Sequence, residues 1–235
     1  MAEMKSVALS KELEQGLLTG RWGPGERLPS HTSLMKEYVV SRTCLREAVA
    51  MLEAKGFLKI RHGSGCYVSN LLEEMFVLPL QELPATDLSS QLAVMEMRQV
   101  LEGEAAYYTC LRATDKELQL IDQEYQRMEK RQGRLPILER AKADLTYHML
   151  IARYSHNLMI ISLSQLLYTR FFNSIYAALS GGMLDKAEDM QVIDEQHRHI
   201  HAQLMSRNSE VARSVALRHA QHTSELLRAS ILSKA

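Results

Sequence analysis

Two serines eleven residues apart, Ser30 and Ser41, stand where short helices are expected to begin. A serine at the N-cap accepts a hydrogen bond from a free backbone N–H of the first helical turn. We expect one helix from Ser30 to about Tyr38 and a second one from Ser41 that ends at Gly56. Only two valines separate these helices, so they must be joined by a tight turn.

The segments on either side of this helix pair complete a recognisable unit. Residues 5–19 have apolar residues at helical spacing, and GRWGPGERLPS then supplies three glycines and two prolines that stop the helix. FLKIRHGSGCYVS predicts two short strands around Gly63-Ser64-Gly65, because glycine tolerates the positive φ angles of tight turns. Helix, helix, turn, helix and hairpin together predict a winged helix-turn-helix in residues 1–70.

The rest of the chain lacks strand patterns. Residues 71–88 contain two prolines and no sustained period, which predicts a linker. From Ser89 the pattern is helical, and residues 89–235 are cut into about six helices. The breaks fall near residues 114–115, 134–136, 156–157, 181–182 and 208–209. The expected fold is mainly α: an N-terminal winged helix-turn-helix with a small β wing, and a C-terminal all-α helical bundle.

The composition of the chain indicates where the protein is located and whether its cysteines are reduced. No apolar run approaches the roughly 20 residues of a membrane span, and the first residues lack the apolar core of a secretion signal. We therefore expect a cytoplasmic protein with no membrane partner. Cys44, Cys66 and Cys110 are odd in number and widely spaced, so we expect them to be reduced.

Charge is distributed unevenly although the net charge of the chain is zero. Residues 1–70 hold ten Lys or Arg and seven Asp or Glu, which gives +3, and the remaining 165 residues therefore carry −3. This sign suits an N-terminal part that faces the phosphates of nucleic acid.

The helix that begins after Ser41 has the design of a DNA-recognition helix. Arg42, Thr43 and Arg46 occupy its first two turns, where such a helix meets base edges, and arginine can pair bidentately with guanine. A second face at helical spacing is apolar and carries Leu45, Val49 and Leu52. The alternative is that both arginines are solvated surface charges.

Histidines are concentrated late in the chain, since seven of nine follow residue 147. Asp144 and His148 are four residues apart on a predicted helix, so they share a face and suit two ligands of one divalent metal. A surface hydrogen bond explains the same spacing. Further candidate ligands lie on the last two helices, and geometry does not choose among His197, His199, His201, His219 and His222.

Two sets of motifs resemble a known family over nearly the whole chain. GRWGPGERLPS, VSRTCLREAVAMLEAKGFLKI and RHGSGCYV resemble the DNA-binding domain of the GntR superfamily. MRQVLEGEAA, DLTYHMLIARYSHN and EQHRHI resemble the all-helical FCD ligand domain of its FadR subfamily. Within that subfamily the chain is most similar to regulators of glycolate, lactate and pyruvate metabolism.

The resemblance implies DNA contacts at Ser41, Arg42, Thr43 and Arg46 and, in a wing that enters the minor groove, at His62 and Gly63. This sequence departs from the family at Thr32, where an arginine that often touches DNA is usual. Related dimers place two recognition helices one DNA turn apart, about 34 Å. We therefore expect a homodimer on a palindromic operator, although no heptad seam is evident in the sequence.

The resemblance also implies a metal site formed by Asp144, His148, His197 and His219, with open positions for an effector. Three imidazoles and one carboxylate suit zinc, nickel, manganese or iron, and we place zinc first. Arg98 matches the arginine that binds an effector carboxylate, and the alternative is an ion pair with Glu102. Asn173 is a further candidate for a hydrogen bond to the effector.

These observations predict a ligand-responsive transcription regulator, a repressor of a small-carboxylate catabolic operon that senses glycolate, lactate or pyruvate. One alternative is a purely structural metal with a different organic acid or sugar acid as effector. A second alternative is a metal-dependent enzyme of the helical bundle, since a metal with open positions can activate water. The chain lacks a His-Glu-x-x-His motif and carries no Glu-x-x-His pair, so we expect no enzyme.

Overall fold

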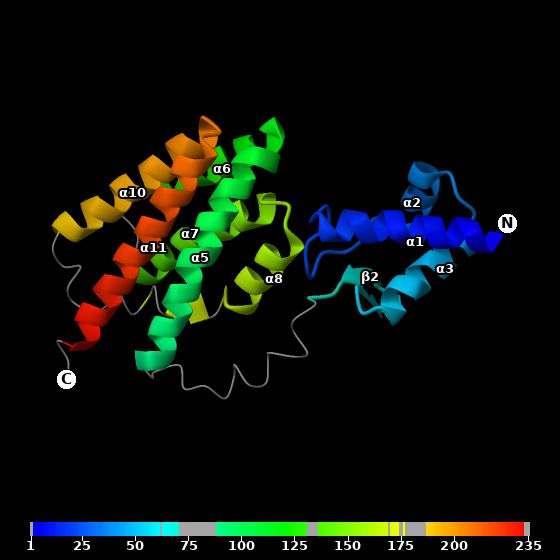
Figure 1. The fold of residues 1–235 in the computed structure, drawn as a ribbon, viewed down its shortest axis with the longest axis horizontal. Helices are drawn as coiled ribbons and strands as arrows, with labels where there is room; N and C mark the ends of the chain where they lie inside the picture. Colours follow the sequence, from blue (N-terminus) through cyan, green and yellow to red (C-terminus); the bar gives the residue numbers. More distant parts are fainter. Residues whose placement is uncertain are drawn as a thin grey trace.

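The computed structural model describes residues 2–61, 63–70, 88–130, 136–168, 170–173, 176 and 187–232. Figure 1 shows two parts, a smaller N-terminal one coloured blue to cyan and a larger helical one coloured green to red. This mainly helical fold with one two-stranded sheet confirms the predicted fold class.

The N-terminal part contains α1 (Ala2–Leu18), α2 (His31–Tyr38), α3 (Arg42–Ala54), β1 (Leu58–Arg61) and β2 (Gly65–Val68). The predicted caps are present: the Ser30 hydroxyl accepts from the N–H of Ser33, and the Ser41 hydroxyl accepts from the N–H of Cys44. The strands pair antiparallel from Leu58 opposite Val68 to Arg61 opposite Gly65. Local sequence signals thus define the winged helix-turn-helix.

The turn between α2 and α3 contains a backbone conformation that the sequence did not signal. Val39 caps α2 with φ 51° and ψ 51°, in the left-handed region, and its side chain is 89% exposed. A β-branched residue rarely adopts this conformation because its Cβ crowds the backbone. The backbone N–H groups of Val39 and Val40 both donate to the carbonyl of Met35, so this conformation closes the C-terminal cap of α2.

The helical part is built around two long helices, α5 (Leu88–Arg112) and α11 (Ser209–Leu232), which pack extensively against each other. The remaining named helices of the described residues are α6 (Asp115–Lys130), α7 (Ile137–Tyr154), α8 (Leu158–Leu166) and α10 (Ala187–Met205). Their shared core includes Ile121, Tyr147, Ile200 and Leu204. Three predicted breaks are confirmed, namely α5 to α6, α7 to α8 and α10 to α11.

Other sequence predictions lie outside the described residues. The breaks at 134–135 and 181–182 fall there, as does all of the predicted linker except Leu88, which begins α5. The three cysteines are free and buried.

Contacts between the two parts are made by the segment that joins α1 to α2 and by Asn70, just after β2. The guanidinium of Arg153, at the end of α7, donates from Nε and Nη2 to both oxygens of Glu26, at 3.1 and 2.9 Å. Its Nη1 also donates to the carbonyl of Gly20. Two amide side chains add contacts: Gln165 donates to the carbonyl of Pro24, and Asn70 to that of Ser162. The end of the helical part is thereby fastened to the winged part.

Candidate DNA interface and metal centre

The start of α3 presents the predicted polar side chains to solvent. Arg42, Thr43 and Arg46 are exposed, whereas Leu45 and Val49 on the opposite face are buried. The hydroxyl of Ser41 is occupied as the helix cap, 3.3 Å from the N–H of Cys44. The helix therefore displays donors on one side while its apolar side anchors it in the core.

A groove runs between the start of α3 and the hairpin. It is lined by Arg27, Arg42, Arg61 and Gly63 among others, so three arginines border one concave surface, while the guanidinium of Arg61 lies over the ring of Tyr67. Gly63 has φ 74° in the turn, as predicted for glycine there, and His62 lies outside the described residues. A surface of this shape and charge can receive a phosphate backbone.

Arg27 was missed at the sequence level because it lies in the glycine- and proline-rich segment before α2. A β-bridge joins Arg27 to Tyr67, and the N–H of Leu28 donates to the carbonyl of Cys66, which aligns the segment with β2. Thr32, where the resemblance expects an arginine, is exposed in the first turn of α2. Arg27 thus adds an arginine to the lining of the groove, which the sequence did not indicate.

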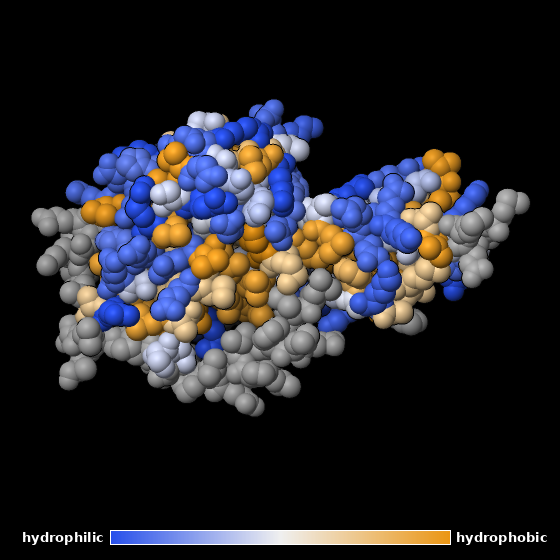
Figure 2. All heavy atoms as spheres, viewed as in Figure 1, coloured by the Kyte–Doolittle hydropathy of each residue, from blue (hydrophilic) through white to orange (hydrophobic). Residues whose placement is uncertain are grey.

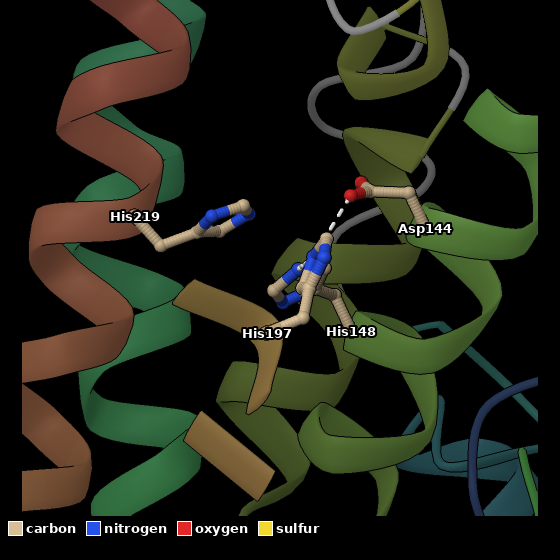
Figure 3. A group of neighbouring side chains, drawn as sticks. All are labelled: Asp144, His148, His197 and His219. Carbon is tan, nitrogen blue, oxygen red and sulfur yellow. Dashed lines mark hydrogen bonds and ion pairs between the residues drawn. The ribbon is translucent and has the colours of Figure 1, made fainter. Parts of the chain in front are cut away.

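Four side chains from three helices meet in the interior of the helical part (Figure 3). Asp144 and His148 come from α7, His197 from α10 and His219 from α11, and one ligand atom of each lies within 4.8 Å of the others. All four residues are buried. The structure thus brings together the four predicted ligands and none of the other candidate histidines.

Polar contacts at Nδ1, a hydrogen bond for His219 and a close carboxylate for His148, hold two of the imidazoles with Nε2 directed inward. His219 Nδ1 lies 3.0 Å from Gln196 Oε1, while its buried Nε2 has no partner among the described residues. His148 Nδ1 lies 3.1 Å from Glu102 Oε2, and its Nε2 lies 3.2 Å from His197 Nε2. Metal-binding histidines commonly have the other ring nitrogen held in this way by an outer acceptor.

The separation of the donor atoms fits a divalent ion. Zinc–nitrogen bonds of about 2.0–2.1 Å place adjacent tetrahedral ligands about 3.3 Å apart. The His148–His197 separation matches this value, and Asp144 Oδ1 lies 3.0 Å from His197 Nε2. With the unpaired Nε2 of His219, the donor set fits a metal of the predicted kind.

Burial and charge shape the ionisation of the cluster. Burial lowers the pKa of His148 and His219 well below the usual value, which favours the neutral, metal-binding imidazole. Burial alone would raise the pKa of Asp144, but the hydrogen bond from His197 and the neighbouring charges hold it well below its usual range. The cluster therefore offers an ionised carboxylate at Asp144 and neutral rings at His148 and His219.

Arg98 on α5 is completely buried beside the cluster. Its Nε donates to Glu102 at 2.5 Å and its Nη2 to Asp144 at 3.4 Å, so the ion pair considered as the alternative is present. Nη1 is buried with no hydrogen-bond partner among the described residues. Burial raises the pKa of Glu102 to about 7, although Arg98 opposes the shift.

The other candidate residues lie away from the cluster. Asn173 is exposed and no described contact joins it to the cluster, whereas Phe171 lines a small cavity together with Glu102 and His148. The remaining histidines after residue 147 have other surroundings. His201 is bonded to Asp122 and stacks on Tyr125, and His156 pairs with Glu117. His199 is exposed near Glu195, and His222 is half-buried. Sequence reasoning missed Gln196 as the partner that orients His219.

Comparison with known proteins matches both parts to families. Residues 5–68 match "Bacterial regulatory proteins, gntR family", and residues 93–222 match "FCD domain". Within the described residues, no helix has the length and apolar character needed to cross a membrane.

Curated relatives are transcription regulators rather than enzymes. The "Glc operon transcriptional activator" of Escherichia coli (strain K12) is 26% identical over 90% of this chain and 84% of its own length. The "Uxu operon regulator" of Haemophilus influenzae is 25% identical over 89% of this chain and 77% of its own length. A "Putative L-lactate dehydrogenase operon regulatory protein" of Escherichia coli is 33% identical over 58% of this chain and 53% of its own length.

Solved structures show the same fold. "Streptococcus agalactiae GntR" aligns with a TM-score of 0.52 and 23% identity, covering 96% of this chain and 100% of that one. "E. coli McbR/YncC" aligns with a TM-score of 0.53 and 16% identity, covering 95% and 98%. With its two matched segments and its mainly helical fold, the chain belongs to the gntR family of bacterial regulatory proteins and carries a C-terminal FCD domain.

Proposed function

We propose that this regulator binds a double-stranded DNA operator and senses a small hydroxy- or keto-acid through a divalent metal held by Asp144, His148, His197 and His219. The observation that carries the proposal is the juxtaposition of this buried cluster with the unpaired Nη1 of Arg98. A buried guanidinium donor without a partner costs free energy, and an acid carboxylate would supply the missing acceptor.

In the proposed site, different groups bind or orient different parts of the acid and of the metal centre. Bound metal, with zinc proposed first, supplies a Lewis-acidic centre for two oxygens of an α-hydroxy or α-keto acid. Arg98 neutralises the carboxylate, and Glu102 and Gln196 hold His148 and His219 in the orientation that presents Nε2. Glycolate, lactate and pyruvate share the required chemistry, and the names of the Glc and lactate relatives support this class.

The proposed signal to DNA follows contacts that start from α7. This helix carries Asp144 and His148 and also Arg153, which forms a hydrogen-bonded ion pair with Glu26. The backbone around Glu26 is bonded to the wing strand, since the N–H of Val68 donates to its carbonyl and the N–H of Gly25 donates to that of Val68. A shift of α7 on acid binding would therefore displace the wing relative to α3.

The proposed DNA-binding form is a homodimer on a palindromic operator in the cytoplasm, because a two-fold reader suits a two-fold site. DNA contacts are assigned to Arg42, Thr43, Arg46, Gly63 and, outside the described residues, His62. We propose repression, so that the acid releases the operator. If the acid instead raised operator affinity, the behaviour would match the word activator in the name of the Glc relative, and the proposed repression would be wrong.

A structural ion without an effector is the second candidate, and the complete burial of His219 favours it. Removal of the metal by a chelator separates the two. A sensor keeps its melting transition and loses its response to acid, whereas a structural ion takes the melting transition with it.

The test is operator binding by fluorescence anisotropy with the promoter region of the chain's own gene, with and without glycolate, lactate, pyruvate and longer acids. We expect one short acid to change operator affinity in the metal-loaded protein. His219→Ala should abolish this response, while His199→Ala, an exposed histidine outside the cluster, should leave it intact. Failure of every acid would refute the effector class, and an unchanged response in His219→Ala would refute the role of the cluster.

A further inference from the structure

The chain just before α2 runs beside β2, on the side away from β1. Arg27 forms an antiparallel β-bridge with Tyr67, and the N–H of Leu28 donates to the carbonyl of Cys66 at 2.9 Å. Residues opposite each other across an antiparallel pair project to the same side of the sheet. The backbone of Arg27 is therefore fixed to the wing, and its exposed side chain leaves on the same side as that of Tyr67.

Gly65 leaves the space that the guanidinium of Arg27 occupies. It lies two residues before Tyr67 on β2, so it faces the same side of the sheet. A Cβ at this position would lie 2.7 Å from Nε and 3.2 Å from Nη2 of Arg27, too close for the guanidinium to stay in place. The guanidinium therefore lies against the backbone of Gly65, beside the turn that carries Gly63.

The groove between α3 and the hairpin has no acidic side chain among the described residues that line it. Arg27 is exposed, and its guanidinium has no ion pair or hydrogen bond to another described residue. Two neighbouring arginines differ: Arg21 is paired with Glu37, and the guanidinium of Arg61 lies 4.8 Å from the ring centre of Tyr67. Arg27 can therefore bind an anion without giving up an existing ion pair.

The position of the groove indicates which anion suits it. α3, with Arg42 at its start, is expected to enter the major groove of DNA, and the wing turn at Gly63 the adjacent minor groove. One sugar–phosphate strand separates neighbouring grooves of a duplex, so this strand has to pass between the two elements. Arg27, Arg42 and Gly63 line the same concave surface. In Figure 1 α3 and the hairpin lie side by side at the lower edge of the winged part, and hydrophilic residues, in blue, reach the surface along this edge in Figure 2.

We propose that Arg27 binds a backbone phosphate of the DNA strand that passes between α3 and the wing turn, with Gly65 as the residue that positions it. The planar fork of a guanidinium suits two phosphate oxygens. A phosphate contact carries no base preference, so Arg27 contributes equally to the binding of operator and of unrelated DNA. This inference rests on the proposed binding of operator DNA and adds a residue to it.

The test is the salt dependence of DNA binding by the full chain, measured by fluorescence anisotropy with the operator and with an unrelated duplex. The slope of log affinity against log salt falls by about 0.9 for each phosphate contact that is lost. Arg27→Gln should lower the slope by about this amount on both duplexes. The affinity for both should fall about fivefold at about 0.15 M salt. Arg27→Lys, which keeps the charge, should retain the slope.

Arg21→Gln is the matched control, because Arg21 is exposed in the same segment but is paired with Glu37 and does not line the groove. It should leave slope and affinity unchanged. Thermal melting should be the same for the Arg27 variants and the wild type, since the side chain is exposed. Arg27→Met, which keeps the apolar stem against Gly65, repeats the measurement should glutamine disturb the wing.

Three outcomes overturn the inference. An unchanged slope in Arg27→Gln and Arg27→Met would show that Arg27 makes no phosphate contact, and a loss of affinity for the operator alone would show that it reads a base. Equal losses in Arg27→Lys and Arg27→Gln would show that Arg27 acts by packing rather than by charge. None of these outcomes bears on Arg46, whereas a wild type that binds neither duplex would refute the proposed operator binding as well.

Discussion

The candidate DNA surface and the histidine cluster differ most in how their functional side chains meet water. Arg42 and Arg46 are exposed, whereas Asp144 and His219 are 8% and 0% exposed. An exposed charge needs no partner in the free protein, but a buried one must be paired at high cost. The surface can therefore change its residues with little effect on folding, while the cluster ties function to stability.

The two regions also differ in the sequence separation of the residues that form them. Arg42, Thr43 and Arg46 occupy two turns of α3, so one capped helix positions all of them. The cluster joins α7, α10 and α11 over 76 residues, from Asp144 to His219. A substitution in one of these helices should therefore disturb the cluster more than a substitution in α3 disturbs the surface.

Asp144→Ala should have the largest effect, because it leaves Arg98 buried with Glu102 as its remaining carboxylate. Loss of one partner of a buried ion pair costs about 3–5 kcal/mol, and we expect a loss in this range in urea unfolding of the metal-free protein. Asp122→Ala removes the half-exposed partner of His201 and should cost under about 1 kcal/mol. Equal losses in the two variants would erase the contrast between buried and exposed charge.

Acidification should destabilise the metal-free protein between pH 6.5 and pH 4.5. The pKa values of His148 and His219 are lowered in the folded state, so in this window the unfolded chain takes up two protons that the folded protein excludes. Glu102 opposes them by one proton, because its folded pKa is raised to about 7. Burial also lowers the pKa of His201, which adds to the uptake by the unfolded chain. The free energy of unfolding should therefore fall on acidification, by about 1.4 kcal/mol per pH unit for each net proton.

Urea titrations at pH 6.5, 5.5 and 4.5 check this slope. His219→Asn removes one of the two titrating rings and should flatten it. A stability that stays constant or rises on acidification would show that the rings are not held neutral.

Arg46→Ala should weaken specific operator binding by about 1–3 kcal/mol and leave unfolding unchanged. Arg127→Ala, an exposed arginine on α6, serves as the control and should leave operator affinity unchanged. Anisotropy at fixed salt measures both. If Arg46→Ala binds like the wild type, α3 does not read the operator through this side chain.

Val39→Gly should have the smallest effect, a gain of up to about 1 kcal/mol in unfolding free energy, because glycine removes the crowding of Cβ at positive φ. Val40→Gly, the neighbour without a positive φ, should lose stability instead. Urea unfolding of both variants and the wild type measures these changes in unfolding free energy. Similar losses in both would show that the turn stores no strain at Val39.

Sequence predicted the winged part well because its signals are local. Ser30 and Ser41 cap the helices that they precede, and Gly63 lies in the turn that it was expected to form. Local rules gave no sign of the left-handed Val39, because this conformation is typical of glycine and rare for valine.

The cluster could not be assembled from spacing alone. His197 and His201 share a helix face, and only the packing shows that His201 turns to Asp122 while His197 meets Asp144. The family resemblance supplied that choice. Gln196 was missed because its partner His219 lies on another helix.

A metal at the buried cluster should let a small acid control the exposed DNA surface. The most direct test of this control is the operator dissociation constant with and without lactate, glycolate or pyruvate, in protein that is metal-loaded, chelated and reloaded. We predict that one of these acids shifts the constant at least about fivefold when metal is present. Chelation should remove the shift, and reloading should restore it. The same shift in chelated protein would show that the acid acts without the metal, and no effect of any acid on metal-loaded protein would show that these acids are not the effectors.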